Sequence, residues 1–498
     1  MKSLRLPIAL LLAAALGYLA WKAPRESGES VRGRTALLSP GALDPENLAE
    51  VVLERGGVRH RFERRGELWW QTEPVAHAVD GWSVRQLAVR ALKLESVRSV
   101  RASSAGEPAQ SLAEVGLDPP LARVTFVERA RPDGTARTTV FELGRRSLAG
   151  RAFARVANGG AAQGHAVQGH EVQGHEVQGH EVQGHEVQGH AFQGQKVQGY
   201  EVVEALLHDF VVDRDPREFR SRDLFAGLGE VDLVELSSGG VTTMLRREGR
   251  RYRLEGVVRT RADRERAEEL VDALRRARSA GFIVDRPAEL AAYGLSPPAA
   301  TLAVTSGGAR TAVLIGDPVS IGAQDRFGLV EGTSTVVRVP AESLVAMVPR
   351  VERLVDPTGT GARSSDVGAV EIVRGEERLE LRREVSGWSA RRFDVDGSPR
   401  EGSVETAAVE RLLAALCETR ASAIEIAPFP VERAVATVTL RGFAGEAIDT
   451  VRIAARTDAG GGAGFAFENG DGVMRTHGAI ELPLAPAELG FQAKPAAP

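Results

Sequence analysis

Apolar and polar residues alternate along three stretches of the chain, and a glycine turn interrupts each stretch. The stretches are residues 49–74, 231–256 and 368–393. Alternation with a period of two is typical of a strand with one buried face, and Gly-Gly or Gly-Glu between two such runs favours a β-hairpin. The pattern therefore predicts three copies of one hairpin. Each copy ends near an aromatic residue: Trp69 and Trp70, then Tyr252, then Trp388.

An amphipathic helix is predicted after each hairpin. Apolar residues recur there at intervals of three and four, which places them on one helix face. Such a stripe more often packs into a core than forms a binding groove. Cys417, beside the third stripe, is expected to pack there as a small hydrophobic residue. The stripes are Leu87, Ala88, Ala91 and Leu92; Ala267, Leu270, Val271, Leu274 and Ala277; and Val409, Leu412, Leu413 and Leu416.

A shared Gly-Leu-x-Pro-Pro motif follows the first two helices, in "VGLDPPLARVTF" from Val115 and "YGLSPPAATLAV" from Tyr293. Gly116 and Gly294 can take the left-handed conformation that ends a short helix. The paired prolines then hold the chain extended into the next strand. A further strand ends in "FELG" and "VLIG", whereas the third copy keeps only the strand "ERAVATVTL". Helix followed by a run of antiparallel strands predicts three related α+β units.

The N-terminus reads as a membrane anchor. The uncharged run from Leu6 to Trp21 follows Lys2 and Arg5 and precedes Lys22. Sixteen residues are slightly fewer than the ~20 of a full span, but Lys22 can extend toward the lipid headgroups. This predicts a single-pass transmembrane helix, with the bulk of the chain extracytoplasmic (periplasmic). A cleaved signal peptide is the alternative, because residues 15–17 have the small-x-small pattern of a cleavage site.

The domain boundaries follow from these elements. The first unit contains an insertion at residues 161–198. The divisions are an anchor at 1–23, a tether at 24–47, the first unit at 48–229, the second unit at 230–350, a linker at 351–366, a third and divergent unit at 367–490, and a tail at 491–498.

The insertion is a pentapeptide repeat, "HEVQGHEVQGHEVQGHEVQGH" from His170 to His190. It separates two predicted strands that the second unit joins through Glu-Gly-Thr, so it occupies the loop of a hairpin. Histidines five residues apart lie about 140° from each other on an α-helix and on alternate faces of a strand. No regular structure gathers them, although a loop can still collect imidazoles around a metal ion. A tolerated insertion is the default interpretation.

Composition excludes several functions. The net charge of −4 gives no electrostatic argument for a nucleic-acid partner, and a single cysteine among 498 residues allows no intramolecular disulfide. The sequence holds no P-loop and no Gly-x-Ser-x-Gly elbow. The acidic run at residues 261–270 is expected to be a solvated helix face. No catalytic, cofactor-binding or metal-binding residue is assigned. The histidines outside the repeat are few and scattered: His60, His77, His208 and His477.

The hairpin with its terminal Trp, the helix and the Tyr-Gly-Leu-x-Pro-Pro motif resemble the bacterial domain-of-unknown-function 4340 family. "FRSRDLF" at residues 219–225 resembles the arginine-containing link of that family. The resemblance covers Leu38 to Met347, and the third unit only by internal repetition; Val115 stands where the family has an aromatic residue. It implies a membrane-anchored extracytoplasmic protein. Some members of the family also resemble auxiliary subunits of gliding-type ABC transporters. It implies no activity and no catalytic residues.

The sequence thus predicts a non-catalytic, membrane-tethered binding or scaffold protein, accessory to an ABC-type transporter, that needs no cofactor. Its expected partners are the membrane and the transporter subunits. Two alternatives remain from other classes of protein. One is an enzyme that acts on envelope polymers, and the other is a metal-capturing protein that uses the histidine repeat.

Overall fold

The computed structural model describes residues 34–101, 110–131, 134–147, 150–157, 199–394, 396–457 and 463–494. The chain divides into two compact units, which meet in sequence between Ser221 and Arg222. The first unit holds one sheet, and the second unit holds two. All strand pairs in the three sheets are antiparallel among the described residues, and helices are few. The fold is therefore α+β and rich in sheet, as expected.

The first sheet has ten strands in the order β1-β6-β10-β9-β8-β7-β2-β3-β4-β5. The predicted hairpin is the pair β2–β3. Its strands are β1 (Thr35–Ala36), β2 (Leu48–Arg55), β3 (Val58–Arg65), β4 (Leu68–Glu73), β5 (His77–Val79), β6 (Glu95–Arg101), β7 (Ala122–Glu128), β8 (Thr138–Arg146), β9 (Arg151–Ala157) and β10 (Gly199–Glu204). Its helical segments are α2 (Gly81–Leu92), α3 (Leu206–His208), the π-turn η2 (Asp209–Asp213) and η3 (Pro216–Phe219).

The second sheet has nine strands in the order β14-β13-β12-β11-β16-β17-β18-β19-β15. They are β11 (Val231–Ser238), β12 (Val241–Glu248), β13 (Arg251–Glu255), β14 (Thr260–Arg261), β15 (Gly281–Asp285), β16 (Ala300–Ser306), β17 (Ala309–Pro318), β18 (Arg326–Val330) and β19 (Thr335–Val339). The helical segments are α4 (Arg264–Arg276), η4 (Leu290–Tyr293), α5 (Ala341–Met347) and α6 (Val351–Leu354).

The third sheet has ten strands in the order β24-β28-β27-β26-β25-β20-β21-β22-β23-β29. Apart from the edge strands β1 and β29, the three sheets share one order of strands along the chain. The strands are β20 (Ala369–Arg374), β21 (Glu377–Glu384), β22 (Gly387–Phe393), β23 (Pro399–Ser403), β24 (Ala423–Ile426), β25 (Ala434–Arg441), β26 (Ala447–Thr457), β27 (Ala463–Glu468), β28 (Val473–His477) and β29 (Gln492–Ala493). The helical segments are η5 (Ser364–Asp366), α7 (Thr406–Cys417) and η6 (Val431–Arg433).

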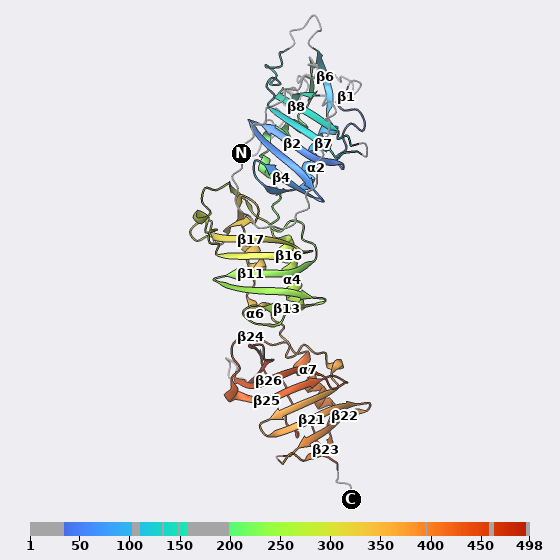
Figure 1. Ribbon diagram of the computed structural model, residues 1–498, viewed down its shortest axis with the longest axis vertical. Coiled ribbons are helices and arrows are strands. Elements are labelled where there is room, and N and C mark those ends of the chain that lie inside the picture. The colour runs from blue at the N-terminus through green and yellow to red at the C-terminus, as the bar shows by residue number, and fades with distance from the viewer. Residues whose placement is uncertain are drawn as a thin grey trace, which may run out of the picture. The chain divides into compact units, whose positions relative to one another are not determined.

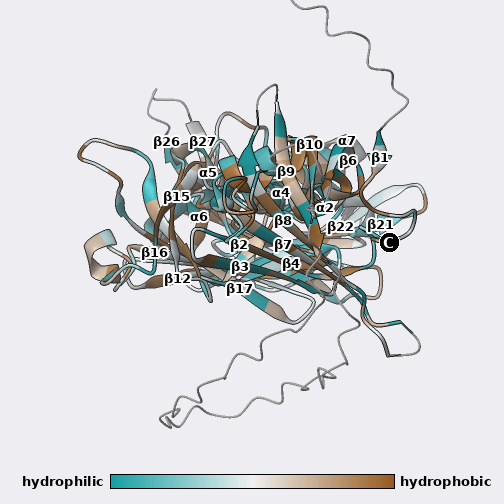
Figure 2. Ribbon diagram, turned by 90° about the horizontal axis from the view of Figure 1, so that it is seen from above, coloured by the Kyte–Doolittle hydropathy of each residue, from teal (hydrophilic) through white to brown (hydrophobic). Residues whose placement is uncertain are grey.

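One long helix packs on each sheet: α2 on the first, α4 on the second and α7 on the third (Figure 1). The apolar stripes predicted from the sequence are buried in these cores, except for the partly buried Leu92. Hydrophobic and hydrophilic residues alternate along the strands (Figure 2), and β7 shows strict alternation of buried and half-buried positions. Each helix begins after an acidic residue, Asp80, Asp263 or Glu405, and the two aspartates accept backbone N–H hydrogen bonds there.

The second and third sheets share a polar junction inside the second unit. Arg475 on β28 is fully buried, and it donates to Thr260 Oγ1 of β14 at 2.9 Å and to the Asp356 carbonyl at 2.9 Å. Asp471 accepts from the same guanidinium at 2.8 Å, so the buried charge is paired. Val473 packs in the core of the second sheet. These contacts explain why two sheets form one compact unit.

Several domain boundaries lie at other residues in the structure than the sequence predicted. The supposed tether contributes β1 and the buried Leu38 and Leu43 to the first unit. Phe219 packs in the first core but Phe225 in the second, so the first unit ends at Ser221, before the expected residue 229. The expected linker is also packed, because Leu354 and Val355 belong to the second core and Ala362 to the third. The expected tail supplies β29, which pairs with β23.

Two expected features lie outside the described residues: the anchor at residues 1–23 and the insertion at residues 161–198. Within the described ranges, no helix has the length and apolar character needed to cross a membrane. β9 and β10 are antiparallel neighbours, as are β18 and β19. Residues 158–198 therefore join the ends of a hairpin whose counterpart is closed by residues 331–334.

Candidate functional site

Several residues singled out in the sequence have structural roles. Gly294 ends η4 in the left-handed conformation, with φ of 64°, and Gly116 has φ of 71°. A Cβ on Gly316, the glycine of "VLIG", would lie 2.1 Å from the Tyr293 carbonyl oxygen, and one on Gly144 would lie 2.3 Å from that of Val115. The glycine of the later strand is thus required because the Gly-Leu-x-Pro-Pro segment packs directly against it.

Cys417 is buried in the third core, where Thr360 Oγ1 donates to its Sγ at 3.6 Å. Burial raises the pKa of this thiol, so it is protonated and unreactive at neutral pH. Of the acidic run, Glu265, Glu268 and Glu269 on α4 are exposed, whereas Asp263 at the start of the helix is buried. The exposed charges pair along the helix, as in Arg264–Glu268 at 2.8 Å. Both observations agree with the structural roles expected from the sequence.

The four histidines outside the repeat are all buried. In the first unit, Gln71 lies 3.5 Å from His60 Nδ1 and accepts a hydrogen bond of 3.0 Å from Arg220 Nε. His77 is paired with Gln71 across β4 and β5. The side chains of His60, Gln71 and Arg220 thus form a buried polar network. In the second unit, burial and the charge of Arg475 lower the pKa of His477 to about 4.

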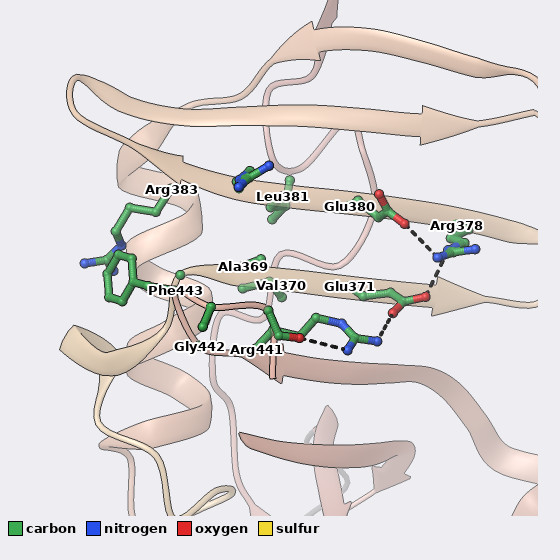
Figure 3. A pocket seen from close by; sticks show the side chains of 14 residues that line it. Ala369, Val370, Glu371, Arg378, Glu380, Leu381, Arg383, Arg441, Gly442 and Phe443 are labelled. Carbon is green, nitrogen blue, oxygen red and sulfur yellow. Dashed lines mark hydrogen bonds and ion pairs between the residues drawn. The ribbon is translucent and has the colours of Figure 1, made fainter. Parts of the chain in front are cut away.

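A pocket opens on the face of the third sheet opposite α7 (Figure 3). The apolar residues Val370, Leu381 and Leu440 face the core under α7, and the residues that alternate with them face the pocket. The volume is about 510 Å³. We call this site the arginine pocket; it is lined by residues 368–371, 378, 380–383 and 441–445.

Strand register creates the hollow. Ala369 on β20 is paired with Arg382 on β21 and with Arg441 on β25, so the small alanine lies between two arginines of the same row. Neighbouring strands lie about 4.8 Å apart, which puts the Cα atoms of the two arginines roughly 10 Å apart. That spacing leaves room for one anionic group above Ala369.

The carboxylates of the pocket are already paired. Glu371 lies between Arg378 and Arg441, at 2.9 and 3.2 Å, and Arg378 also contacts Glu380 at 2.6 Å (Figure 3). Arg382 differs from these residues. It is exposed, and its side chain makes no hydrogen bond or ion pair with any residue that the structure describes. The Arg382 guanidinium is therefore available to a ligand.

The turn between β25 and β26 forms one wall of the pocket. The Gly442 N–H donates to the Glu446 carbonyl at 2.9 Å, and the Gly445 N–H donates to the Gly442 carbonyl at 3.0 Å. A Cβ on Gly368 would lie 2.7 Å from Phe443 Cα, so glycine lets the turn approach β20. Phe443 is 66% exposed. The wall thus offers an apolar surface beside the arginines.

The lining residues include no serine, threonine, cysteine, histidine, lysine or tyrosine. Arginine holds its proton at any ordinary pH and cannot serve as a general base. It binds carboxylates and phosphates through paired N–H donors. The arrangement suits recognition of an anion next to an apolar group. For metal binding, the structure places one group of suitable donors within its described part, His208 with Asp209 and Asp213.

No site residue was predicted from the sequence, so neither the arginine pocket nor the group of His208, Asp209 and Asp213 was anticipated. The arginine pocket depends on pairing between positions more than 50 residues apart, which no local pattern reveals. His208, Asp209 and Asp213 do stand close together in "HDFVVD". That short motif was the available signal, but a five-residue interval falls on different faces of an α-helix.

Residues 253–435 match a known family, described as Domain of unknown function (DUF4340). No curated protein matches the chain. The matched stretch runs from β13 in the second sheet, through the Tyr293 motif and α7, to the start of β25 in the third sheet. It overlaps the expected Leu38–Met347 only from Arg253 onward, and it extends through the divergent third hairpin. This part of the chain matches the DUF4340 family model, which confirms the resemblance found in the sequence.

Proposed function

We propose that this chain is a non-catalytic binding or scaffold protein, tethered to a bacterial membrane and facing away from the cytoplasm, as an accessory to an ABC-type transporter. In this proposal its three related α+β units present a binding surface to a partner protein. The observation that carries the proposal is the arginine pocket, where an unpaired Arg382 and an exposed Phe443 share one uncovered sheet face.

An acidic segment of a partner fits this pocket. A carboxylate above Ala369 would reach both Arg382 and Arg441, and an apolar neighbour would cover Phe443. Arginine and aromatic residues supply much of the binding energy in protein interfaces. Glu371 holds Arg441 at 3.2 Å, which fixes one guanidinium before the ligand arrives. Such preorganisation lowers the entropic cost of binding.

Peptide binding tests the pocket. The probe is a fluorescein-labelled peptide of alternating glutamate and leucine, titrated by anisotropy into the full chain. Replacing both pocket arginines (Arg382→Gln with Arg441→Gln) should weaken binding about tenfold or more, since each charged hydrogen bond contributes roughly 1.5–3 kcal/mol. Arg391→Gln is the matched control, because Arg391 lies outside the pocket and pairs with Glu401 at 3.0 Å.

Equal weakening by the double variant and by the control would contradict a specific pocket, and so would equal binding of a lysine–leucine peptide.

The membrane tether needs its own test. Protease added to spheroplasts should degrade the chain beyond residue 40, because Lys2 and Arg5 hold the N-terminus inside. Full protection of that region would contradict the outward-facing orientation.

A further inference from the structure

A cluster of metal-binding side-chain types lies in the first unit, directly after β10. The short helix α3 ends at His208 and passes directly into the π-turn η2, Asp209–Asp213. In a π-turn the backbone bonds residue i to i+5, whereas five residues of α-helix rotate by about 140°. The wider turn therefore brings Asp213 back beneath His208.

The three side chains converge. His208 Nδ1 lies 3.7 Å from Asp209 Oδ1 and 3.9 Å from Asp213 Oδ2. One ligand atom from each of the three residues falls within 4.8 Å of the others. The His208 side chain is only 5% exposed, and neither ring nitrogen makes a hydrogen bond with a described residue. A buried imidazole loses its hydration, and a bond to a metal ion would restore a partner to it.

The backbone of this turn is held in place. The Arg55 guanidinium donates to the carbonyls of Val211, Val212 and Arg214, at 3.0, 2.6 and 2.8 Å. Leu207 and Val211 pack in the first core. Because the turn is fixed on both sides of the donors, the site needs little reorganisation to bind an ion.

We propose that His208, Asp209 and Asp213 form a binding site for a divalent transition metal ion such as Zn²⁺ or Co²⁺. One imidazole nitrogen and two carboxylate oxygens are the donor types that these ions accept, and the open side toward solvent would supply water. Burial lowers the pKa of His208, so its ring is neutral at pH 7 and its lone pair is free to bind. This site is separate from the histidine repeat.

Arg146 sets the conditions for binding. Its guanidinium contacts Asp209 and lies 3.4 Å from Asp213, and its side chain is 52% exposed. The positive charge of Arg146 therefore offsets the negative charges of both carboxylates. A metal ion that binds there must displace the guanidinium into solvent. Arg146→Gln should strengthen metal binding about tenfold, the value of two exposed ion pairs. A purely structural ion-pair cluster would not respond in this way.

The experiment removes the competing imidazoles of the repeat. The parent is the full chain with six histidines changed to glutamine: His165, His170, His175, His180, His185 and His190. Co²⁺ alone is titrated and followed by its visible absorption, and Zn²⁺ is titrated in competition with a chromophoric chelator. We expect one equivalent to bind. Asp213→Asn should weaken binding at least tenfold, since even a residue that only orients a metal ligand contributes about 10- to 100-fold to affinity. Asp215→Asn makes the same charge change two residues away and should have little effect.

Three results would overturn the proposal: no stoichiometric binding by the parent, equal weakening by Asp213→Asn and Asp215→Asn, or weaker binding by Arg146→Gln. His208→Phe provides a second ligand variant, since its ring would fill the same buried space. Circular dichroism checks that each variant is folded. If His208→Phe fails to fold, the comparison of Arg146→Gln, Asp213→Asn and Asp215→Asn still decides the question, because all three changes lie at partly exposed side chains.

Discussion

Acid should destabilise the second unit through His477. This ring is 1% exposed, stacks on Phe467 with 4.4 Å between ring centroids, and has no hydrogen bond to a described residue at either nitrogen. Burial and the nearby Arg475 lower its pKa to about 4, whereas an unfolded histidine titrates near 6.5. Between those pH values the unfolded chain binds the additional proton. Stability is therefore full above pH 6.5 and falls as the pH drops toward 4.

The magnitude follows from the shift. One pKa unit corresponds to about 1.4 kcal/mol, so the full loss below pH 4 is about 3 kcal/mol, and the loss at pH 5 is about 2 kcal/mol. His477→Leu removes the titrating group and sacrifices no hydrogen bond to a described residue. The variant should therefore lose about 2 kcal/mol less than the wild type between pH 7 and pH 5, and stabilities at pH 7 should differ by less than about 1.5 kcal/mol.

Pulsed hydrogen exchange across a urea gradient can measure this, read from the peptide that spans β27 and β28. This readout reports on the second unit alone, so titration of histidines in the first unit does not enter. Identical pH dependence in the wild type and His477→Leu would refute the reasoning. A variant that loses more stability in acid than the wild type would also refute it.

Three further changes test other parts of the fold. Gly316→Ala places a Cβ against the Tyr293 carbonyl and should cost about 1–3 kcal/mol in urea unfolding; Gly281→Ala, in open space on the same sheet, should change stability by less than about 0.5 kcal/mol. Leu412→Ala, in the fully buried stripe of α7, should cost about 2–5 kcal/mol, and a loss below about 1 kcal/mol would contradict its place in the core. Replacing residues 161–198 with Glu-Gly-Thr should leave the melting temperature of the first unit unchanged or slightly higher, because loop closure changes by only about 0.6 kcal/mol per doubling of length. A clear fall in that temperature would show that the repeat supports the fold.

Local pattern predicted the elements because their causes are local. The stripe around Leu274 and the alternation along β20 each reflect one buried face, and both are buried as expected. The left-handed conformation of Gly294 was also predictable from the sequence, since few other residues tolerate that conformation. These features need only a window of a few residues.

Features that depend on pairing between strands far apart in the sequence could not be predicted from it. Arg441 and Arg382 meet across Ala369 only because β25 and β21 both pair with β20. The unit boundary was missed for a similar reason, because Phe219 and Phe225 stand six residues apart in one polar segment yet enter different cores. Nothing in their spacing distinguishes them. The π-turn at Asp209 likewise depends on Arg55, which lies on β2 and binds its carbonyls.

The pairing of β9 with β10 has a consequence for how this sequence can change over time. The two strands lie in register at Glu201 and Ala154, so the chain leaves and re-enters the sheet at neighbouring points. Any number of pentapeptides can be gained or lost between Ala157 and Gly199 without altering that separation. Tandem copies of a short coding unit are prone to slippage during replication. Close relatives should therefore differ in the number of pentapeptides while keeping identical strands on either side.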